Sequence, residues 1–242
     1  MNEDPAAPEE VGPRSPGGPV PESAPNTAGR PVAWLLLAGI LLGAGVVSLY
    51  GEVWWTGPAR FVPAATEVPW PLSEFGGGEG SKGLDVADYR MVIARVVGNA
   101  RAIAYAPSQL FARAQCYPLE NALIVADPML ASGLLAAPGV FVSSDPLVAF
   151  NSYLVLMALF SGAAMCALVW KWSGVPAAGI VAGLIYALHP YKVGNVSHAF
   201  IFDTAWTVLA LFFAQRLFDR GRIVDGLALG LCCVLQMAEG FY

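Results

Sequence analysis

Long apolar runs separated by polar segments dominate this sequence. The first run covers residues 32–50, VAWLLLAGILLGAGVVSLY, and contains no charged side chain. Its length is close to that of a helix crossing a hydrocarbon core of roughly 30 Å. A long polar interval follows, and after it come four further apolar runs at residues 147–170, 176–188, 199–217 and 225–241. The pattern predicts an all-α protein, a multispanning bundle of transmembrane helices.

The polar interval at residues 51–145 contains a helical period of its own. Between residues 88 and 105, apolar side chains recur at steps of three or four residues: Tyr89, Val92, Val96, Ala100 and Ile103. Arg90, Asn99 and Arg101 fall on other faces. This pattern is typical of an amphipathic helix lying along a membrane surface.

A second short helix is predicted within the same interval, over residues 129–136. Pro128 precedes it and Pro138 follows it, and proline is tolerated at a helix start but disrupts a helix interior. The interval therefore reads as a loop that carries two interfacial helices.

Basic residues in the short connections predict the orientation. They lie before the first run, after the second, and between the last two: Arg14, Arg30, Lys171, Arg216, Arg220 and Arg222. Short loops rich in Lys and Arg stay in the cytoplasm. The N-terminal tail at residues 1–31, whose Pro, Gly, Ala, Ser and Glu predict disorder, is then cytoplasmic, and the loop at 51–145 faces outward. We expect a multi-pass protein of the plasma (inner) membrane.

Composition narrows the classes of function. The chain is 56% hydrophobic and 13% charged, against roughly a quarter charged in soluble domains, so membrane lipids are its expected surroundings. A net charge of -5 provides no basic field for nucleic acid. The four cysteines have no metal-ligand spacing, and two histidines are too few for a typical zinc site.

Polar residues from residue 88 onward occur in a distinctive order. An Asp heads the amphipathic helix, an Asn lies within it, and a Tyr-Pro pair, an Asn and an acid follow: Asp88, Asn99, Tyr117, Pro118, Asn121 and Asp127. The later runs continue the order with Asn151, Pro190, Tyr191, Lys192, His198 and Trp206. This order resembles the N-terminal part of bacterial GT-C glycosyltransferases, membrane enzymes that use polyprenyl-phosphate-linked sugars. Those proteins usually have many more spans, so the resemblance implies a truncated bundle.

The resemblance implies transfer of a hexosyl or pentosyl group from a polyprenyl-phosphate donor to an extracytoplasmic acceptor. Inverting transfer needs a carboxylate to take the acceptor proton and a cation near the departing phosphate. Asp88 is the candidate catalytic base, with Asp85 as its rival. Asp127 is the candidate second catalytic acid, which orients the acceptor or holds a divalent cation, Mg²⁺ or Mn²⁺.

Five further residues are candidates for substrate binding. Cationic or aromatic side chains suit the phosphate and the lipid headgroup, and an acid near the end of the last run suits the same outward site: Lys192, His198, Tyr191, Arg90 and Glu239.

The same residues have simpler interpretations. Asp88 and Asp127 each precede a predicted helix and suit the role of helix caps. Arg90, Arg95 and Arg101 suit a stripe that faces solvent or lipid headgroups, and Tyr191 suits an interfacial aromatic belt. For the whole chain, the alternatives to an enzyme are a transporter-like or assembly subunit and an inactive fragment. The sequence names neither the sugar nor the acceptor.

Overall fold

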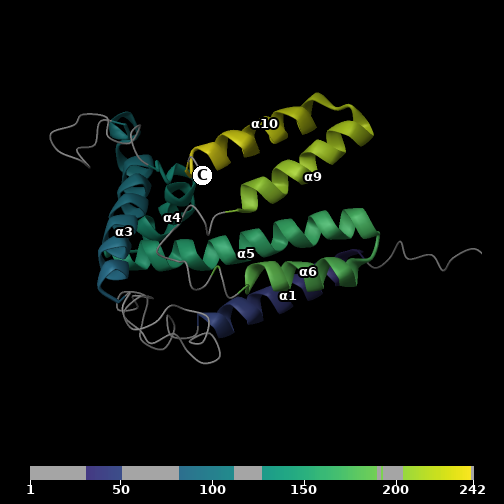
Figure 1. Cartoon of the computed structure of the whole chain (residues 1–242), viewed down its shortest axis with the longest axis horizontal. Helices are drawn as coiled ribbons and strands as arrows, with labels where there is room; N and C mark the ends of the chain where they lie inside the picture. The colour runs from purple at the N-terminus through teal and green to yellow at the C-terminus, as the bar shows by residue number, and fades with distance from the viewer. Residues whose placement is uncertain (1–30, 51–81, 112–126, 190–191, 193–203, 241–242) are drawn as a thin grey trace, which may run out of the picture.

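The computed structural model describes residues 31–50, 82–111, 127–189, 192 and 204–240, with side chains from residue 90 onward in the second range. Every regular element in these residues is a helix, which confirms the all-α prediction for them (Figure 1). The elements are α1 (Pro31–Leu49), α3 (Lys82–Tyr105), η3 (Pro107–Gln109), α4 (Leu130–Val142), α5 (Pro146–Ser173), α6 (Pro176–Ala187), α9 (Ala205–Arg220) and α10 (Ile223–Met237).

Helix α5 is the centre of the arrangement. It packs against α1 and α6 along one side and against α9 on another, and α10 pairs with α9. These helices run lengthwise in Figure 1, whereas α3 runs across one end of α5. Helix α4 contacts both α3 and α5, so it joins the crossing helix to the lengthwise ones.

Two helices are long and apolar enough to cross a membrane. These are α1 and α5, with mean hydropathies of 2.4 and 2.0. Helix α1 leaves large apolar side chains uncovered: Leu35 is 60% exposed and Ile40 66%. Exposed apolar surface of this kind is a feature of segments that meet lipid or a partner. The two helices indicate that the protein associates with a membrane.

The other predicted spans are shorter in the structure. Helix α6 has 12 residues, α9 has 16 and α10 has 15, against about 20 for a helix that crosses the bilayer upright. The first part of the run predicted at 199–217 lies outside the described residues, and α9 continues beyond its end to Arg220.

Local sequence signals fix the ends of the longer helices. Asp145 caps α5, because its Oδ1 accepts from the backbone N–H of Leu147 at 2.8 Å, and Pro146 occupies the first helical position. Gly174 ends α5 and Gly221 ends α9 with φ of 68° and 61°. That left-handed conformation favours glycine, which makes it a common way to end a helix.

The prediction that the second loop helix ends before Pro138 is wrong. Helix α4 continues through Pro138 to Val142. An interior proline costs about 3 kcal/mol, and close packing against α5 offsets that cost. A Cβ added to Gly139 would lie 2.6 Å from the Cα of Ala149, so the two backbones touch at this point. Pro138 itself lies on the exposed face of α4, away from α5.

Helices α5 and α6 also approach to backbone contact. A Cβ added to Gly183 would lie 2.6 Å from the carbonyl oxygen of Gly162 and 3.0 Å from the Cβ of Cys166. Small residues that permit such close approach are a feature of helix packing in lipid. Large buried side chains of α5, among them Phe150, Tyr153 and Met157, then fill the core toward α3 and α4.

Candidate functional site

Polar groups from three helices meet where α4 begins. We call this cluster the α4 entry; it comprises Arg95 and Asn99 of α3, the segment 127–132, and Glu239 after α10. It lies at the end of α5 that α3 crosses (Figure 1). Two of the sequence-predicted site residues, Asp127 and Glu239, belong to it.

Helix α3 holds the backbone that leads into α4. The Arg95 guanidinium donates to the carbonyl oxygen of Asp127 at 3.0 Å. One turn further along α3, the Asn99 amide donates to the carbonyl oxygens of Pro128 at 2.7 Å and Met129 at 3.1 Å. Three side-chain hydrogen bonds therefore fix three consecutive carbonyl groups.

The buried position of Asn99 corrects the sequence prediction. Periodicity placed it away from the apolar face of α3, but it is 0% exposed, like its neighbours Val96 and Ala100. A buried amide is stable only with hydrogen-bond partners, and the two carbonyl groups supply them. Periodicity alone does not reveal such a partner, because the carbonyls lie about thirty residues further along the chain.

Met129 makes the turn into α4 in a conformation that is uncommon for its residue type. Its φ of 49° and ψ of 37° are left-handed, a region sparsely populated by residues other than glycine. Its backbone N–H donates to the carbonyl oxygen of Glu239 at 3.2 Å, and that of Leu130 donates to Ala238 at 2.9 Å. The end of α10 therefore accepts the first hydrogen bonds of the α4 entry.

Glu239 completes the start of α4 with its side chain. The carboxylate is 0% exposed, and its Oε2 accepts from the backbone N–H of Ser132 at 2.8 Å. Its Oε1 accepts from the Ser132 hydroxyl. A carboxylate at a helix N-terminus is stabilised by the unpaired N–H groups and by the helix dipole. Glu239 therefore caps the N-terminus of α4 from the segment that follows α10.

The residue at the N-cap position of α4 explains why the cap comes from another segment. Met129 is the N-cap residue of α4 and makes no side-chain capping bond, so the orphan N–H groups of the helix require acceptors from elsewhere. The same observation shows that the alternative interpretation of Asp127 as the cap of α4 is wrong.

Asp127 is half-buried, and its backbone rather than its side chain is held by Arg95. Among the described residues, its carboxylate makes no hydrogen bond or ion pair. The side chain is thus carried on a fixed backbone while its oxygens stay available to another group.

Asp88 lies within α3, whose first residue is Lys82 rather than a residue near 88. Asp88 is therefore past the first turn of α3, and its interpretation as a helix cap is wrong. Asp85 lies in the first turn. The side chains of both acids lie outside the described residues, so the choice between them stays a prediction.

The other candidates are distributed along the chain. Arg90 is exposed on α3. Lys192 is buried, 7% exposed, with its Nζ 3.8 Å from the ring centroid of Tyr186, a cation–π contact. The Tyr186 hydroxyl in turn lies 2.5 Å from the Thr204 hydroxyl. Tyr191 and His198 lie outside the described residues.

In the described part of the chain, no group of three or more His, Cys, Asp or Glu side chains is placed to hold a metal ion. The sequence assigned the divalent cation to Asp127, and the side chain of the other predicted acid, Asp88, is not described, so the cation stays a prediction.

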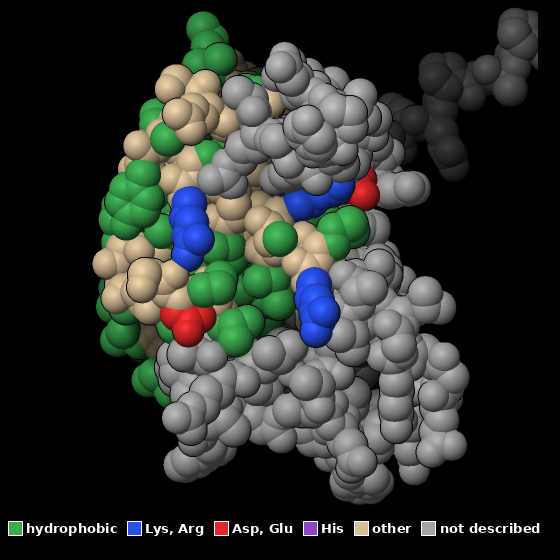
Figure 2. All heavy atoms as spheres, turned by 90° about the vertical axis from the view of Figure 1, so that its left-hand side faces the viewer, with side chains coloured by type: hydrophobic (Ala, Val, Ile, Leu, Met, Phe, Trp, Pro, Cys, Tyr) green, Lys and Arg blue, Asp and Glu red, His purple; other side chains and the backbone are tan. Residues whose placement is uncertain are grey.

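The face at the α3 end combines charge with apolar surface. Figure 2 views the molecule from that end and shows Lys or Arg side chains next to hydrophobic ones. Arg90 and Arg101 of α3 are exposed, as are Tyr105 at 64% and Phe141 at 66%. Cationic and aromatic groups together suit the boundary between headgroups and hydrocarbon.

Comparisons of the chain with protein-family models, with curated proteins and with solved structures found no match. The resemblance to GT-C glycosyltransferases therefore stays a prediction from the sequence motifs.

Proposed function

We propose that the protein is a multispanning membrane glycosyltransferase that moves a sugar from a polyprenyl-phosphate donor to an acceptor outside the cytoplasm. One observation supports this proposal above the others. The α4 entry carries the half-buried carboxylate of Asp127 on a fixed backbone at the end of α5, one of the two helices long enough to cross a membrane. A lipid-linked substrate presents its phosphate at the membrane surface, where the end of a membrane-crossing helix lies.

Basic residues in the short connections at one end of the lengthwise helices support the proposed orientation. Lys171, Arg216 and Arg220 lie toward the C-terminal ends of α5 and α9, and Arg222 follows in the short connection to α10. Basic short connections favour the cytoplasmic side. The N-terminal end of α5, the crossing helix α3 and the α4 entry are then extracytoplasmic.

In the proposed reaction, two acids act on the acceptor and a group of cationic and aromatic residues binds the lipid phosphate. Asp88 takes the proton of the acceptor hydroxyl as the acceptor oxygen bonds to the anomeric carbon. The bond from that carbon to the phosphate oxygen breaks, and the lipid phosphate leaves with the electron pair. Asp127 orients the acceptor or holds Mg²⁺ or Mn²⁺. Lys192 and His198, with Tyr191, stabilise the departing phosphate, while Arg90 meets the lipid headgroup.

The test is sugar transfer by the full-length protein in liposomes supplied with labelled polyprenyl-phosphate sugars. We expect Asp88→Asn to lower transfer by about 10²–10⁴-fold, the usual loss for a general base, and Asp127→Asn to lower it as well. Asp145→Asn is the matched control, because Asp145 caps α5 and asparagine caps helices comparably. Wild-type rates in both Asp88→Asn and Asp127→Asn, or no transfer from any donor by the wild type, would contradict the proposal.

A further inference from the structure

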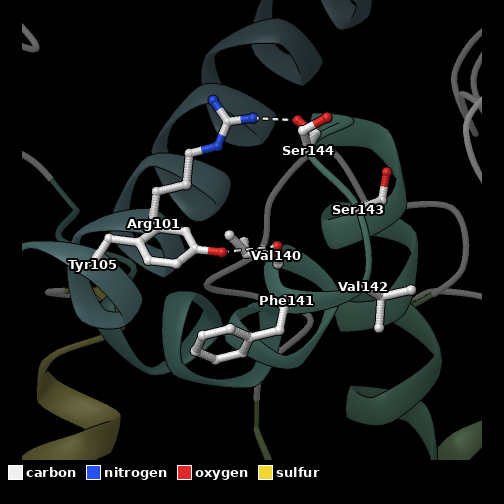
Figure 3. Close-up of a pocket in the computed structure, with 7 residues that line it drawn as sticks. All are labelled: Arg101, Tyr105, Val140, Phe141, Val142, Ser143 and Ser144. Atoms are coloured by element: carbon white, nitrogen blue, oxygen red, sulfur yellow. Dashed lines mark hydrogen bonds between the residues drawn. The ribbon is translucent and has the colours of Figure 1, made fainter.

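A cavity of about 490 Å³ lies between the C-terminal ends of α3 and α4, apart from the α4 entry (Figure 3). Its lining combines one cation, two serines and apolar side chains, with Arg101, Tyr105, Phe141, Val142 and Ser144 among them. The segment that follows the cavity leads directly into α5 at Pro146.

The cation in this cavity has donors to spare. One terminal nitrogen of Arg101 donates to the carbonyl oxygen of Ser144 at 2.5 Å, a bond drawn in Figure 3. A guanidinium has five N–H donors, and among the described residues the others on Arg101 make no hydrogen bond. The Ser144 bond fixes the side chain at the cavity wall while most of its donors stay available.

No acidic side chain lines the described part of this cavity. Asp145 is adjacent in sequence, but its Oδ1 accepts from the Leu147 N–H as the cap of α5. Among the described lining residues, Arg101 is the one charged side chain, and a cation of this kind is complementary to an anion.

The rim of the cavity is apolar and uncovered. Val142 is 81% exposed, Phe141 66% and Tyr105 64%. The two rings meet edge to face, with centroids 5.7 Å apart and planes at 74°. A free inorganic anion would leave this surface in water, whereas a lipid would cover it with acyl chain while its headgroup meets the guanidinium.

We propose that this cavity binds the phosphodiester group of a glycerophospholipid of the surrounding bilayer. Arg101 holds two phosphate oxygens in the paired geometry that guanidinium groups adopt with phosphate. Val142 and the Tyr105–Phe141 pair line the start of the acyl chains. The proposal rests on the membrane placement given under Proposed function and does not rest on glycosyl transfer.

The experiment measures retained phospholipid. The full chain is taken from nanodiscs of phosphatidylglycerol and phosphatidylcholine into mild detergent, and native mass spectrometry counts the lipids that stay bound. Charge-assisted hydrogen bonds contribute about 1.5–3 kcal/mol, so we expect Arg101→Gln to lower retention roughly ten-fold or more. Arg220→Gln is the matched control, because Arg220 is exposed at the far end of α9.

A second variant tests the same site with a substitution that we do not expect to disturb folding. Val142→Asp changes a largely exposed side chain and places a negative charge beside the phosphate, so we expect it to lower retention too. Equal retention by the wild type and Arg101→Gln, or equal losses in Arg101→Gln and Arg220→Gln, would overturn the proposal. Displacement of the lipid by excess inorganic phosphate alone would also overturn it, because the site would then recognise a free anion.

Discussion

The carboxylate of Glu239 closes the first turn of α4 through both the backbone N–H and the hydroxyl of Ser132. The two residues are 107 positions apart in the sequence. This contact ties the end of α10 to α4, which packs against both α3 and α5. The polar groups of the α4 entry are therefore positioned by three separate segments of the chain.

The first prediction concerns this cap. Glu239→Ala removes both acceptors from Ser132 and leaves its buried N–H unsatisfied, so we expect the free energy of unfolding to fall by about 1–3 kcal/mol. Glu239→Gln retains one carbonyl acceptor and should lose less. The measurement is thermal or denaturant unfolding in detergent, followed by circular dichroism.

The control for the cap is Asp219→Asn, which removes one partner of the ion pair between Lys171 and Asp219. The Asp219 side chain is 47% exposed, and exposed ion pairs contribute about 0–1 kcal/mol. Equal stability of Glu239→Ala and Asp219→Asn would show that Glu239 does not act as a cap.

The second prediction concerns Asn99. Asn99→Asp preserves the shape of the side chain but replaces the amide donor with an acceptor that faces the carbonyl oxygens of Pro128 and Met129. We expect a loss of stability of about 3 kcal/mol and faster hydrogen exchange at Met129 and Leu130. Gln109→Glu makes the same chemical change at an exposed site and should leave exchange at the α4 entry unaltered.

Sequence patterns predicted much of the scaffold and less of the α4 entry. Apolar length placed α1 and α5 within a few residues of their ends, and periodicity identified Val92, Val96 and Ala100 as buried. These features depend on local hydrophobicity. The burial of Asn99, the capping role of Glu239 and the passage of α4 through Pro138 depend on partners distant in the sequence, which a local pattern does not contain.

The third prediction tests the backbone contact between α5 and α6. A Cβ at Gly183 would meet the carbonyl oxygen of Gly162 at 2.6 Å, which backbone atoms cannot easily relieve. We expect Gly183→Ala to destabilise the protein by about 1–3 kcal/mol. Gly43→Ala is the matched control in α1, where a Cβ meets nothing within 4 Å. It should be neutral or stabilising by about 0.5–1 kcal/mol, and the reverse order of the two variants would refute the close packing.

The fourth prediction tests the proposed orientation. In a background without native cysteines, Ser144→Cys and Arg222→Cys introduce one thiol at each end of the lengthwise helices, and both positions are exposed. We expect a membrane-impermeant maleimide added to intact cells to label Ser144→Cys alone. Permeabilised cells should allow labelling of both. Labelling of Arg222→Cys in intact cells would place the basic connection outside and contradict the orientation.

The fifth prediction uses an asymmetric ion pair between α9 and α10. The Arg216 Nε lies 2.7 Å from the Asp225 Oδ1, and the Arg216 side chain is 29% exposed while that of Asp225 is 2% exposed. Oδ2 of Asp225 has no hydrogen-bond partner among the described atoms. Arg216 can therefore reach water without its partner, whereas Asp225 cannot.

This asymmetry predicts unequal effects of removing the two partners. Arg216→Met strands a buried carboxylate and should cost about 3–5 kcal/mol of unfolding free energy. Asp225→Ala leaves a cation that reaches water and stays over the rings of Phe212 and Phe213, so its cost should be smaller. The double variant should resemble Asp225→Ala, because the stranded carboxylate is then absent. Unfolding of all three variants measures these differences, and an Arg216→Met protein at least as stable as Asp225→Ala would show that the burial of Asp225 does not control the pair.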